Sequence, residues 1–420
     1  MKLRIKNIGK IKEANIEIDG IAVIAGENNS GKSTISKSLY AMFDGFHNID
    51  NRIKNERQQS LAEMLDRVYQ NASDVIFGNV EGADVAKLLI DNIVKYRDNA
   101  KLTKEEILDQ YMSDEFIEDI EKMSDELENI MPEVMEVLNI SDDVLFRRVL
   151  TRAFTAEFSG QINNVYNEQE GEVELEIKNT KLNVIIKNNI VDKIENRIDL
   201  RVEPIYFDNP FIMDEQNYIY RMTDLRAYND HKSSLRRKIF KADDNASIVN
   251  EILAINKLEK IYSKINEVCS GEIIRGRNTV YKERGMEKGL YMKNISSGLK
   301  TFAMLKMLLI NGTIEKNGTI ILDEPEIHLH PQWQLVFAEL IVLIQKEFGV
   351  HILLNTHSPY FLQAIEVYAA KYEMADKCKY YLSSLVDEQS VIEDVTDNIE
   401  KVYSKLAKPF QILENERYSE

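Results

Sequence analysis

Residues 26–34 have the composition and spacing of a phosphate-binding loop. The stretch reads Gly26, Glu27, Asn28, Asn29, Ser30, Gly31, Lys32, Ser33 and Thr34, which fits GxxxxGK[ST]. Glycines let backbone N–H groups curl around phosphate oxygens, and a helix N-terminus favours the anion. Lys32 would reach the β- and γ-phosphates of a nucleotide, and the Ser33 hydroxyl would bind Mg²⁺. A glycine turn without a ligand is the alternative.

Two carboxylates end an apolar stretch in the second half of the chain. The stretch runs from Thr319 to Pro325, and its acids are Asp323 and Glu324. Acids at the carboxyl end of a buried strand lie where open α/β sheets bind ligands. Asp323 would hold Mg²⁺ through water, and Glu324 would polarise an attacking water. An acidic strand end alone is commonplace; with a phosphate loop upstream it predicts a hydrolytic site.

A small-residue turn precedes the acidic strand. In Ile295–Lys300, Ser296, Ser297 and Gly298 would let backbone amides approach a phosphate at the start of a helix. A serine that merely caps the helix would explain the pattern equally well. The position of the turn shortly before the acidic strand favours the phosphate-binding role.

A histidine follows the next predicted strand, in Asn355-Thr356-His357-Ser358. His357 could hydrogen-bond the γ-phosphate and keep the water and Glu324 in register. A single histidine is more often structural. Its place after Glu324 favours the functional role.

Strands and helices at both ends of the chain must position these residues. Short strands are expected at Leu3–Lys6, Ala14–Ile18 and Ile21–Ala25, followed by a helix after Lys32. Near the other end, a helix from Gly298 to Ile310 leads to the acidic strand, and a helix from Gln332 to Phe348 leads to the strand before His357. Neither end holds a complete site, so the two ends are expected to share one sheet.

The sequence therefore predicts an α/β fold with a mixed sheet flanked by helices and interrupted by a helical insertion. The expected nucleotide-binding unit comprises residues 1–50 and 271–408. The expected insertion, 51–270, includes a β-hairpin at 171–190 and a strand at 202–210. Residues 409–420 read as a loosely held polar tail.

Composition narrows the classes of function. Two distant cysteines, Cys269 and Cys378, fit a reduced cytoplasmic compartment and exclude a cysteine-based zinc site. No apolar run approaches the ~20 residues of a membrane span, so no membrane contact is expected. The formal net charge of −17 argues against general nucleic-acid binding. The basic stretch 226–241 is the exception, and it contains Arg226 and His231 at the RxxxxH spacing of HEPN-type ribonucleases.

Together these motifs resemble the Walker A, signature, Walker B and switch-histidine motifs of ABC ATPases. The variants GENNSGKST, SSGLKTF, LDEPEIHLHPQWQ and NTHSPYFL resemble the OLD/RecF/SMC branch of P-loop NTPases. They look most like the stand-alone ATPase subunits of bacterial anti-phage systems of the Septu and overcoming-lysogenization-defect kind. The resemblance covers the two ends of the chain well and the middle only loosely.

The resemblance implies ATP and Mg²⁺ as cofactors and a homodimer that sandwiches two ATP molecules. Ser296 and Gly298 would then act on the γ-phosphate bound by the partner subunit. Glu326 and His330 would lie in the D-loop region at the dimer interface. Asp208 and Asn209 stand where a Q-loop glutamine is expected, and Gln216 is a weaker candidate.

Three functions remain open at this point. The first is an ATPase that switches a separately encoded effector, a nuclease or toxin, in phage defence, because no DxD motif of an embedded nuclease follows His357. The second is an ATPase that clamps DNA in repair or maintenance, supported by the basic stretch. The third, a transporter subunit, fits the long insertion and the SSGLK turn poorly.

Overall fold

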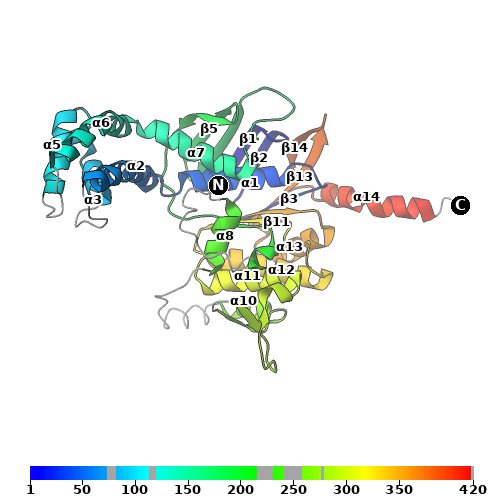
Figure 1. Cartoon of the computed structure of the whole chain (residues 1–420). Coiled ribbons are helices and arrows are strands. Elements are labelled where there is room, and N and C mark those ends of the chain that lie inside the picture. The colour runs from blue at the N-terminus through cyan, green and yellow to red at the C-terminus, as the bar shows by residue number, and fades with distance from the viewer. Residues whose placement is uncertain (73–81, 113–119, 215–229, 241–257, 276–278, 418–420) are drawn as a thin grey trace. The chain divides into compact units, whose positions relative to one another are not determined.

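The computed structural model describes residues 1–72, 82–112, 120–214, 230–240, 258–275 and 279–417. These residues divide into two compact units, the first formed by residues 1–47 and 150–420 and the second by residues 48–149. Figure 1 shows the course of the chain through the first unit, where both ends of the sequence contribute to one sheet.

An 11-stranded mixed sheet organises the described part of the first unit, in the order β6-β5-β4-β1-β2-β14-β13-β3-β12-β11-β7. The strands are β1 Lys2–Ile8, β2 Ile11–Glu17, β3 Ile21–Gly26, β4 Gly171–Ile177, β5 Thr180–Lys187, β6 Ile190–Glu195, β7 Ile205–Phe207, β11 Thr319–Asp323, β12 His351–Thr356, β13 Cys378–Val386 and β14 Gln389–Asp394. The predicted α/β class, with a mixed sheet flanked by helices, is confirmed.

The parallel part of the sheet carries the predicted chemistry. β13, β3, β12, β11 and β7 run parallel to one another, and Asp323 of β11 lies opposite Asn355 of β12. β3 is buried along its whole length, as expected for a strand covered on both faces. The carboxyl ends of β3, β11 and β12 therefore meet at one edge of the sheet, where open α/β sheets bind ligands.

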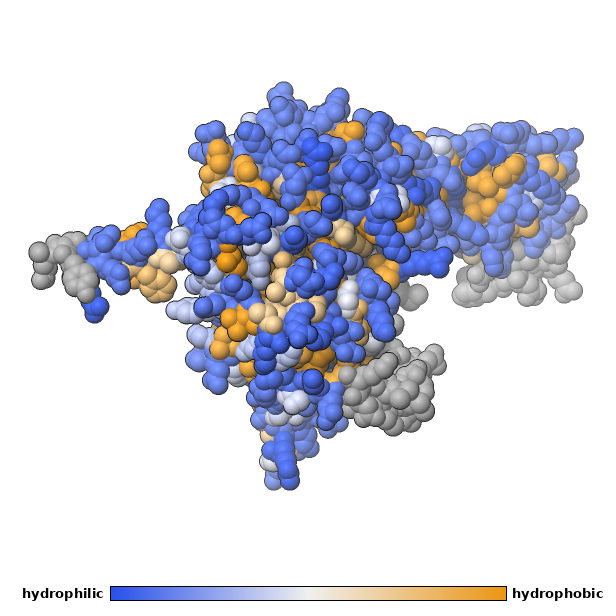
Figure 2. Space-filling model, turned by 180° about the vertical axis from the view of Figure 1, so that it is seen from behind, coloured by the Kyte–Doolittle hydropathy of each residue, from blue (hydrophilic) through white to orange (hydrophobic). Residues whose placement is uncertain are grey.

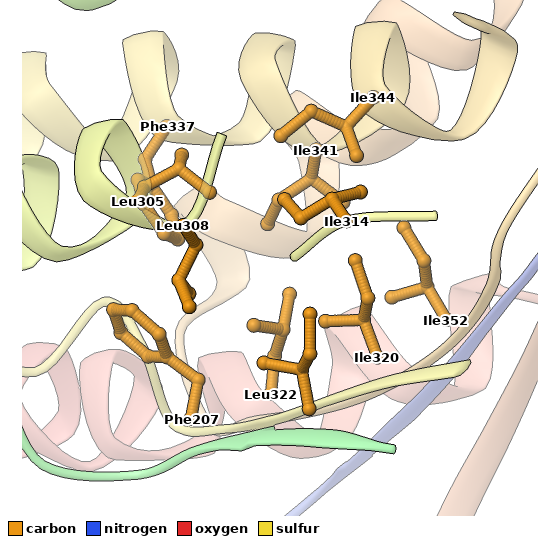
Figure 3. Close-up of a pocket in the computed structure, with 11 residues that line it drawn as sticks. Phe207, Leu305, Leu308, Ile314, Ile320, Leu322, Phe337, Ile341, Ile344 and Ile352 are labelled. Carbon is orange, nitrogen blue, oxygen red and sulfur yellow. The ribbon is translucent and has the colours of Figure 1, made fainter. Parts of the chain in front are cut away.

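Helices cover this part of the sheet (Figure 1). They are α1 Lys32–Phe46, α11 Ser297–Ile310, α12 Pro331–Phe348 and α13 Pro359–Lys371, with α8 His231–Phe240 and α10 Glu259–Asn266 beside them. The apolar faces of α8, α10, α11, α12 and α13 form one core with the sheet. This core contains a hollow of about 20 Å³. Apolar side chains such as Phe207, Leu308 and Ile341 line it (Figure 3). It has no polar partner to hold a water and is a packing gap rather than a ligand site.

The predicted hairpin at 171–190 belongs to the sheet and not to the insertion. β4 pairs with β1 from Glu172 to Glu176, so the alternating face of Val173, Leu175, Leu182 and Val184 is buried in the first unit. The expected insertion boundaries 51–270 are wrong for the same reason: a strand that pairs with β1 cannot belong to a separate helical unit. The expected strand at 202–210 is also shorter, with β7 limited to Ile205–Phe207.

The second unit is helical and has its own core. It contains α2 Ile49–Ala72, α3 Gly82–Asp91, α4 Ile93–Tyr96, α5 Ala100–Met112 and α6 Ile120–Asn139, and the first part of α7 Asp142–Phe158. Leu61, Leu65, Leu89 and Leu127 are completely buried within it. The helical insertion is thus real but extends only over residues 48–149.

The remaining elements are small. A three-stranded sheet of β8 Glu272–Ile274, β9 Val280–Lys282 and β10 Leu290–Tyr291 precedes α11. Residues 409–417 of the tail expected at 409–420 belong to α14 Glu400–Arg417, which continues through Pro409 with Phe410 and Leu413 exposed, and residues 418–420 lie outside the described residues. Figure 2 shows such hydrophobic side chains on this otherwise hydrophilic helix. Among the described helices, none is long and apolar enough to cross a membrane.

Candidate nucleotide-binding site

The loop between β3 and α1 has the backbone that a phosphate-binding loop needs. Asn29 and Gly31 adopt positive φ angles of 62° and 86°. A Cβ atom on Gly31 would lie 2.7 Å from Ile11 Cδ1 and 2.8 Å from Ser390 Oγ, so only glycine fits there. Asn28 and Asn29 are exposed, and Lys10 Nζ donates to Asn29 Oδ1 at 2.9 Å.

Two serines that sequence reasoning missed hold this loop from the far end of the chain. Ser383 Oγ of β13 and Ser390 Oγ of β14 both donate to the Ser30 carbonyl, and both serines are fully buried. Ser30 Oγ in turn donates to the Glu27 carbonyl at 2.7 Å. Both hydroxyls need a hydrogen-bond partner because they are buried, but β14 reads QSVIED and is mostly polar, so the sequence carries no signal that Ser390 is buried.

Lys32 begins α1 and is directed back into the loop. Its Nζ atom donates to the carbonyls of Gly26 at 3.1 Å and Glu27 at 2.9 Å, and it lies 3.3 Å from Glu324 Oε1. The side chain is only 4% exposed. The predicted phosphate-binding lysine and the predicted water-activating carboxylate are therefore neighbours in one chain.

The two acids at the end of β11 have different surroundings. Asp323 accepts a hydrogen bond on each oxygen, from Tyr206 Oη at 2.9 Å and from Asn355 Nδ2 at 2.8 Å. Glu324 adopts a positive φ of 50°, an uncommon conformation for a non-glycine residue that turns the chain away from the strand. Its N–H donates to the Asn355 carbonyl at 3.0 Å, which fixes this turn.

His357 completes the cluster. Its Nδ1 atom lies 3.4 Å from Glu324 Oε1. The contact with His357 lowers the pKa of Glu324, and Lys32 adds to this effect while burial opposes it. The same contact raises the pKa of His357 against the effect of burial. Glu324 is therefore an ionised acceptor at neutral pH, as a group that orients water requires.

Glu326 lies inside the chain and not on a surface that a partner could reach. Its side chain is 1% exposed, and its Oε1 atom accepts hydrogen bonds from Thr356 Oγ1 and from the His357 N–H. The Glu326 side chain itself is therefore not available to a partner, while the place of Glu326 in a D-loop region stays a prediction. His330, the other residue expected there, is exposed and caps α12 by accepting from the Gln332 N–H at 3.3 Å.

The small-residue turn at Ser296–Gly298 forms the start of α11. Ser296 caps α11 by accepting from the Leu299 N–H at 3.3 Å, and it is exposed. A Cβ atom on Gly298 would lie 2.9 Å from the His328 carbonyl, so packing within the chain also requires this glycine. Across the described ranges, no hydrogen bond or ion pair joins Ser296, Ser297 or Gly298 to Lys32, Glu324 or His357.

The groups that could hold a metal are a hydroxyl and a carboxylate. Ser33 is exposed in the first turn of α1, with Thr34 beside it, and Asp323 ends β11. Hard oxygen ligands suit Mg²⁺, which usually takes one or two protein ligands and completes its shell with water and phosphate. Within the described residues there is no cluster of three or more His, Cys, Asp or Glu side chains that could hold a metal alone.

Asp208, at the expected Q-loop position, is engaged within the chain. His231 Nε2 lies 3.1 Å from Asp208 Oδ2, and His231 Nδ1 lies 2.6 Å from Glu157 Oε2. Burial alone would lower the pKa of His231, but the hydrogen bonds to Asp208 and Glu157 raise it to about 9. Gln216 and Arg226, the other predicted candidates, lie outside the described residues.

Comparison with known proteins identifies a family, a relative in sequence and similar solved structures. The sequence pattern described as an AAA ATPase domain matches residues 1–362. An OLD nuclease of Thermus scotoductus (strain ATCC 700910 / SA-01) is 32% identical over 102 residues, which are 24% of this chain and 19% of that protein. The match thus spans about a fifth of that relative's length.

Solved SMC heads are similar at low identity. The head domain from Thermotoga maritima is 14% identical, covering 94% of this chain and 98% of that one with a TM-score of 0.38. An SMC head bound to the C-terminal winged-helix domain of ScpA is 13% identical, covering 94% and 96% with a TM-score of 0.45.

Proposed function

Because the chain belongs to the AAA ATPase domain family, we propose that it binds ATP with Mg²⁺ and hydrolyses it at the cluster of Lys32, Asp323, Glu324 and His357. Membership of this family, together with the similarity to the OLD nuclease, also confirms the resemblance to ATPases of the OLD/RecF/SMC branch. The observation that carries the proposal is the contact of Lys32 and His357 with the same oxygen of Glu324, at 3.3 and 3.4 Å.

Each residue has a distinct role in this proposal. The backbone amides of the loop and the Lys32 ammonium hold the phosphates, so phosphate oxygens compete with the Gly26 and Glu27 carbonyls for Lys32. Ser33 and Asp323 hold Mg²⁺, which supplies charge neutralisation at the phosphates when bound. Ionised Glu324 orients and polarises the attacking water, and His357 keeps Glu324 in place and donates toward the γ-phosphate.

We further propose that the active form is a homodimer in which the turn at Ser296–Gly298 completes the site of the partner. Ser296 of this turn is exposed and Ser297 is half-buried, while Gly298 is buried. Among the described residues, no hydrogen bond or ion pair joins the turn to the catalytic cluster of its own chain. Ile327 and Tyr360 follow Glu324 and His357 closely and are 53% and 57% exposed. Exposed apolar side chains beside a catalytic site are typical of a surface that becomes buried on association.

The biological role we propose is the control of a separately encoded nuclease or toxin in defence against phage, as the motif variants suggest. The alternative, a DNA clamp, depends on the basic stretch at 226–241. Within α8 the charge is partly offset, because Lys238 contacts Glu203 and Lys232 lies 3.8 Å from Asp208. The acidic surroundings make this stretch a weak ligand for a phosphate backbone.

Two substitutions test the ATPase. We expect Lys32→Ala to abolish ATP binding, measured by titration calorimetry, because it removes the only buried cation of the described cluster. Glu324→Gln should bind ATP, lose about 10²–10⁴-fold in hydrolysis, and accumulate as an ATP-dependent dimer in light scattering. Wild-type rates of phosphate release from Glu324→Gln would show that the catalytic assignment is wrong.

The role in defence needs a test in cells. A tagged protein should recover the effector from cell extracts, and deletion should raise phage plating, while Lys32→Ala should fail to restore protection. Unchanged plating on deletion, with no recovered protein, would contradict this role. Salt-sensitive DNA binding lost on replacing Arg236 and Arg237 by Glu would favour the DNA clamp instead.

A further inference from the structure

Tyr206 is a buried phenol directed at the predicted metal ligand. It lies in β7, is 2% exposed, and donates its hydroxyl hydrogen to Asp323 Oδ2 at 2.9 Å. Asn355, on the other side of β11, donates to Asp323 Oδ1 at 2.8 Å. The two strands that flank β11 therefore hold one carboxylate oxygen each, which fixes the rotation of the carboxylate plane.

The Tyr206 ring contacts two other rings, one stacked and one tilted. Its centroid is 4.1 Å from that of His231 in a stacked arrangement, with an interplanar angle of 23°. On another side it meets Tyr40 of α1, with centroids 5.9 Å apart. His231 in turn lies between the carboxylates of Glu157 and Asp208. Asp208 Oδ1 is buried without a hydrogen-bond partner in the described structure, so the ring contacts with His231 and Tyr40 provide the restraint. The phenol hydroxyl therefore cannot move away from Asp323 without disturbing these neighbours.

We propose that Tyr206 is a positioning residue for the metal: it orients Asp323 toward Mg²⁺, while His231, Glu157 and Asp208 keep the Tyr206 ring in place. This inference rests on the proposed function, in which Asp323 holds the metal. A carboxylate oxygen that accepts one hydrogen bond retains lone pairs for a further ligand. Groups that orient a metal ligand in this way typically contribute about 10–100-fold to metal affinity.

Tyr206→Phe tests the role because it removes one oxygen and keeps the ring. The probe is Mn²⁺ in place of Mg²⁺, with ADP bound, and free Mn²⁺ is measured by electron paramagnetic resonance. We expect the affinity for Mn²⁺ to fall about tenfold. The affinity for ADP in EDTA should stay within twofold of wild type, because the loop and Lys32 are unchanged.

Tyr381→Phe is the matched control. Tyr381 is equally buried, in β13 of the same sheet, and its hydroxyl is hydrogen-bonded to the backbone of Glu17 rather than to Asp323. Both variants lose one buried hydroxyl, so both should show a similar loss in Tm. Only Tyr206→Phe should lose affinity for Mn²⁺.

The possible outcomes are separable. Wild-type Mn²⁺ affinity in Tyr206→Phe, or an equal loss in Tyr381→Phe, would overturn the positioning role and leave the ATPase proposal standing. If the wild-type protein bound neither ADP nor ATP, the proposed function would fail and this inference with it.

Discussion

At the scale of single residues, Glu326 connects two motifs that the sequence presents as separate. Its Oε1 atom accepts from the His357 N–H at 3.3 Å and from Thr356 Oγ1, and its Oε2 atom is buried without a hydrogen-bond partner in the described structure. Burial raises the pKa of Glu326. The Glu326 carboxylate therefore fixes the loop that carries His357. Burial of a carboxylate with one unpartnered oxygen costs free energy, which a neutral side chain at this position would not cost.

Replacement of Glu326 should separate hydrolysis from binding. Glu326→Ala removes the acceptor for two donors and frees the His357 loop, so we expect phosphate release to fall about tenfold or more, with ATP binding retained. Glu326→Gln keeps an acceptor oxygen and should stay within about threefold of wild type, while removing the cost of a buried carboxylate. The measurement is steady-state phosphate release beside calorimetric titration. Equal activity of the Ala and Gln variants would contradict the role.

Sequence reasoning named the candidate residues that lie in motifs and missed the residues that support them. Lys32, Asp323, Glu324 and His357 were predicted because each belongs to a short motif of adjacent residues. Tyr206, Ser383 and Ser390 were not, because their roles arise from strand order: β7 lies beside β11, and β13 lies beside β3. A pattern along the chain does not reveal which distant strands become neighbours.

At the scale of elements, the phosphate loop depends on β13 and β14. The carbonyl of Ser30 accepts from Ser383 and Ser390, and β13 pairs with β3 from Ile21 to Gly26. Alternation predicted β4 and β5 correctly as a hairpin but assigned them to the insertion. Periodicity identifies the buried face of a strand, but it does not say which sheet buries that face.

The two serines should therefore be partly redundant. We expect Ser383→Ala and Ser390→Ala each to lower the free energy of unfolding by about 1 kcal/mol. The double variant should lose more than the sum, because it leaves the Ser30 carbonyl buried without a donor from either side chain. ATP affinity should fall most in the double variant. Denaturant unfolding and ATP titration check both effects, and strictly additive losses would contradict the redundancy.

At the scale of the whole molecule, the chain consists of two units with separate cores. The core of residues 48–149 contains Leu61, Leu89 and Leu127, while the core of the first unit surrounds α11 and α12. A Cβ atom on Gly45 would lie 3.6 Å from the Cα atom of Leu150. The chain thus leaves and re-enters the first unit at nearly the same place, which sequence patterns of charge and helicity could not indicate.

Because the chain leaves and re-enters the first unit at neighbouring points, the first unit should fold without the second. Replacement of residues 48–149 by a short Gly-Ser linker should give a soluble protein whose Tm falls by only a few degrees and which still binds ATP. The checks are circular dichroism melting and calorimetry, with Lys32→Ala in the shortened protein as the control for binding. An unfolded product would show that the units depend on each other for stability.

The bonds from Ser383 and Ser390 to Ser30 span 353 and 360 positions of sequence. During translation, the phosphate loop is therefore synthesised 353 residues before Ser383 and 360 residues before Ser390, the side chains that fasten it. A nascent chain that already displays the lysine and glycines would hold them loosely and have little affinity for the abundant nucleotide around it. Nucleotide capture therefore has to wait until β13 and β14 have been synthesised and paired with the rest of the sheet.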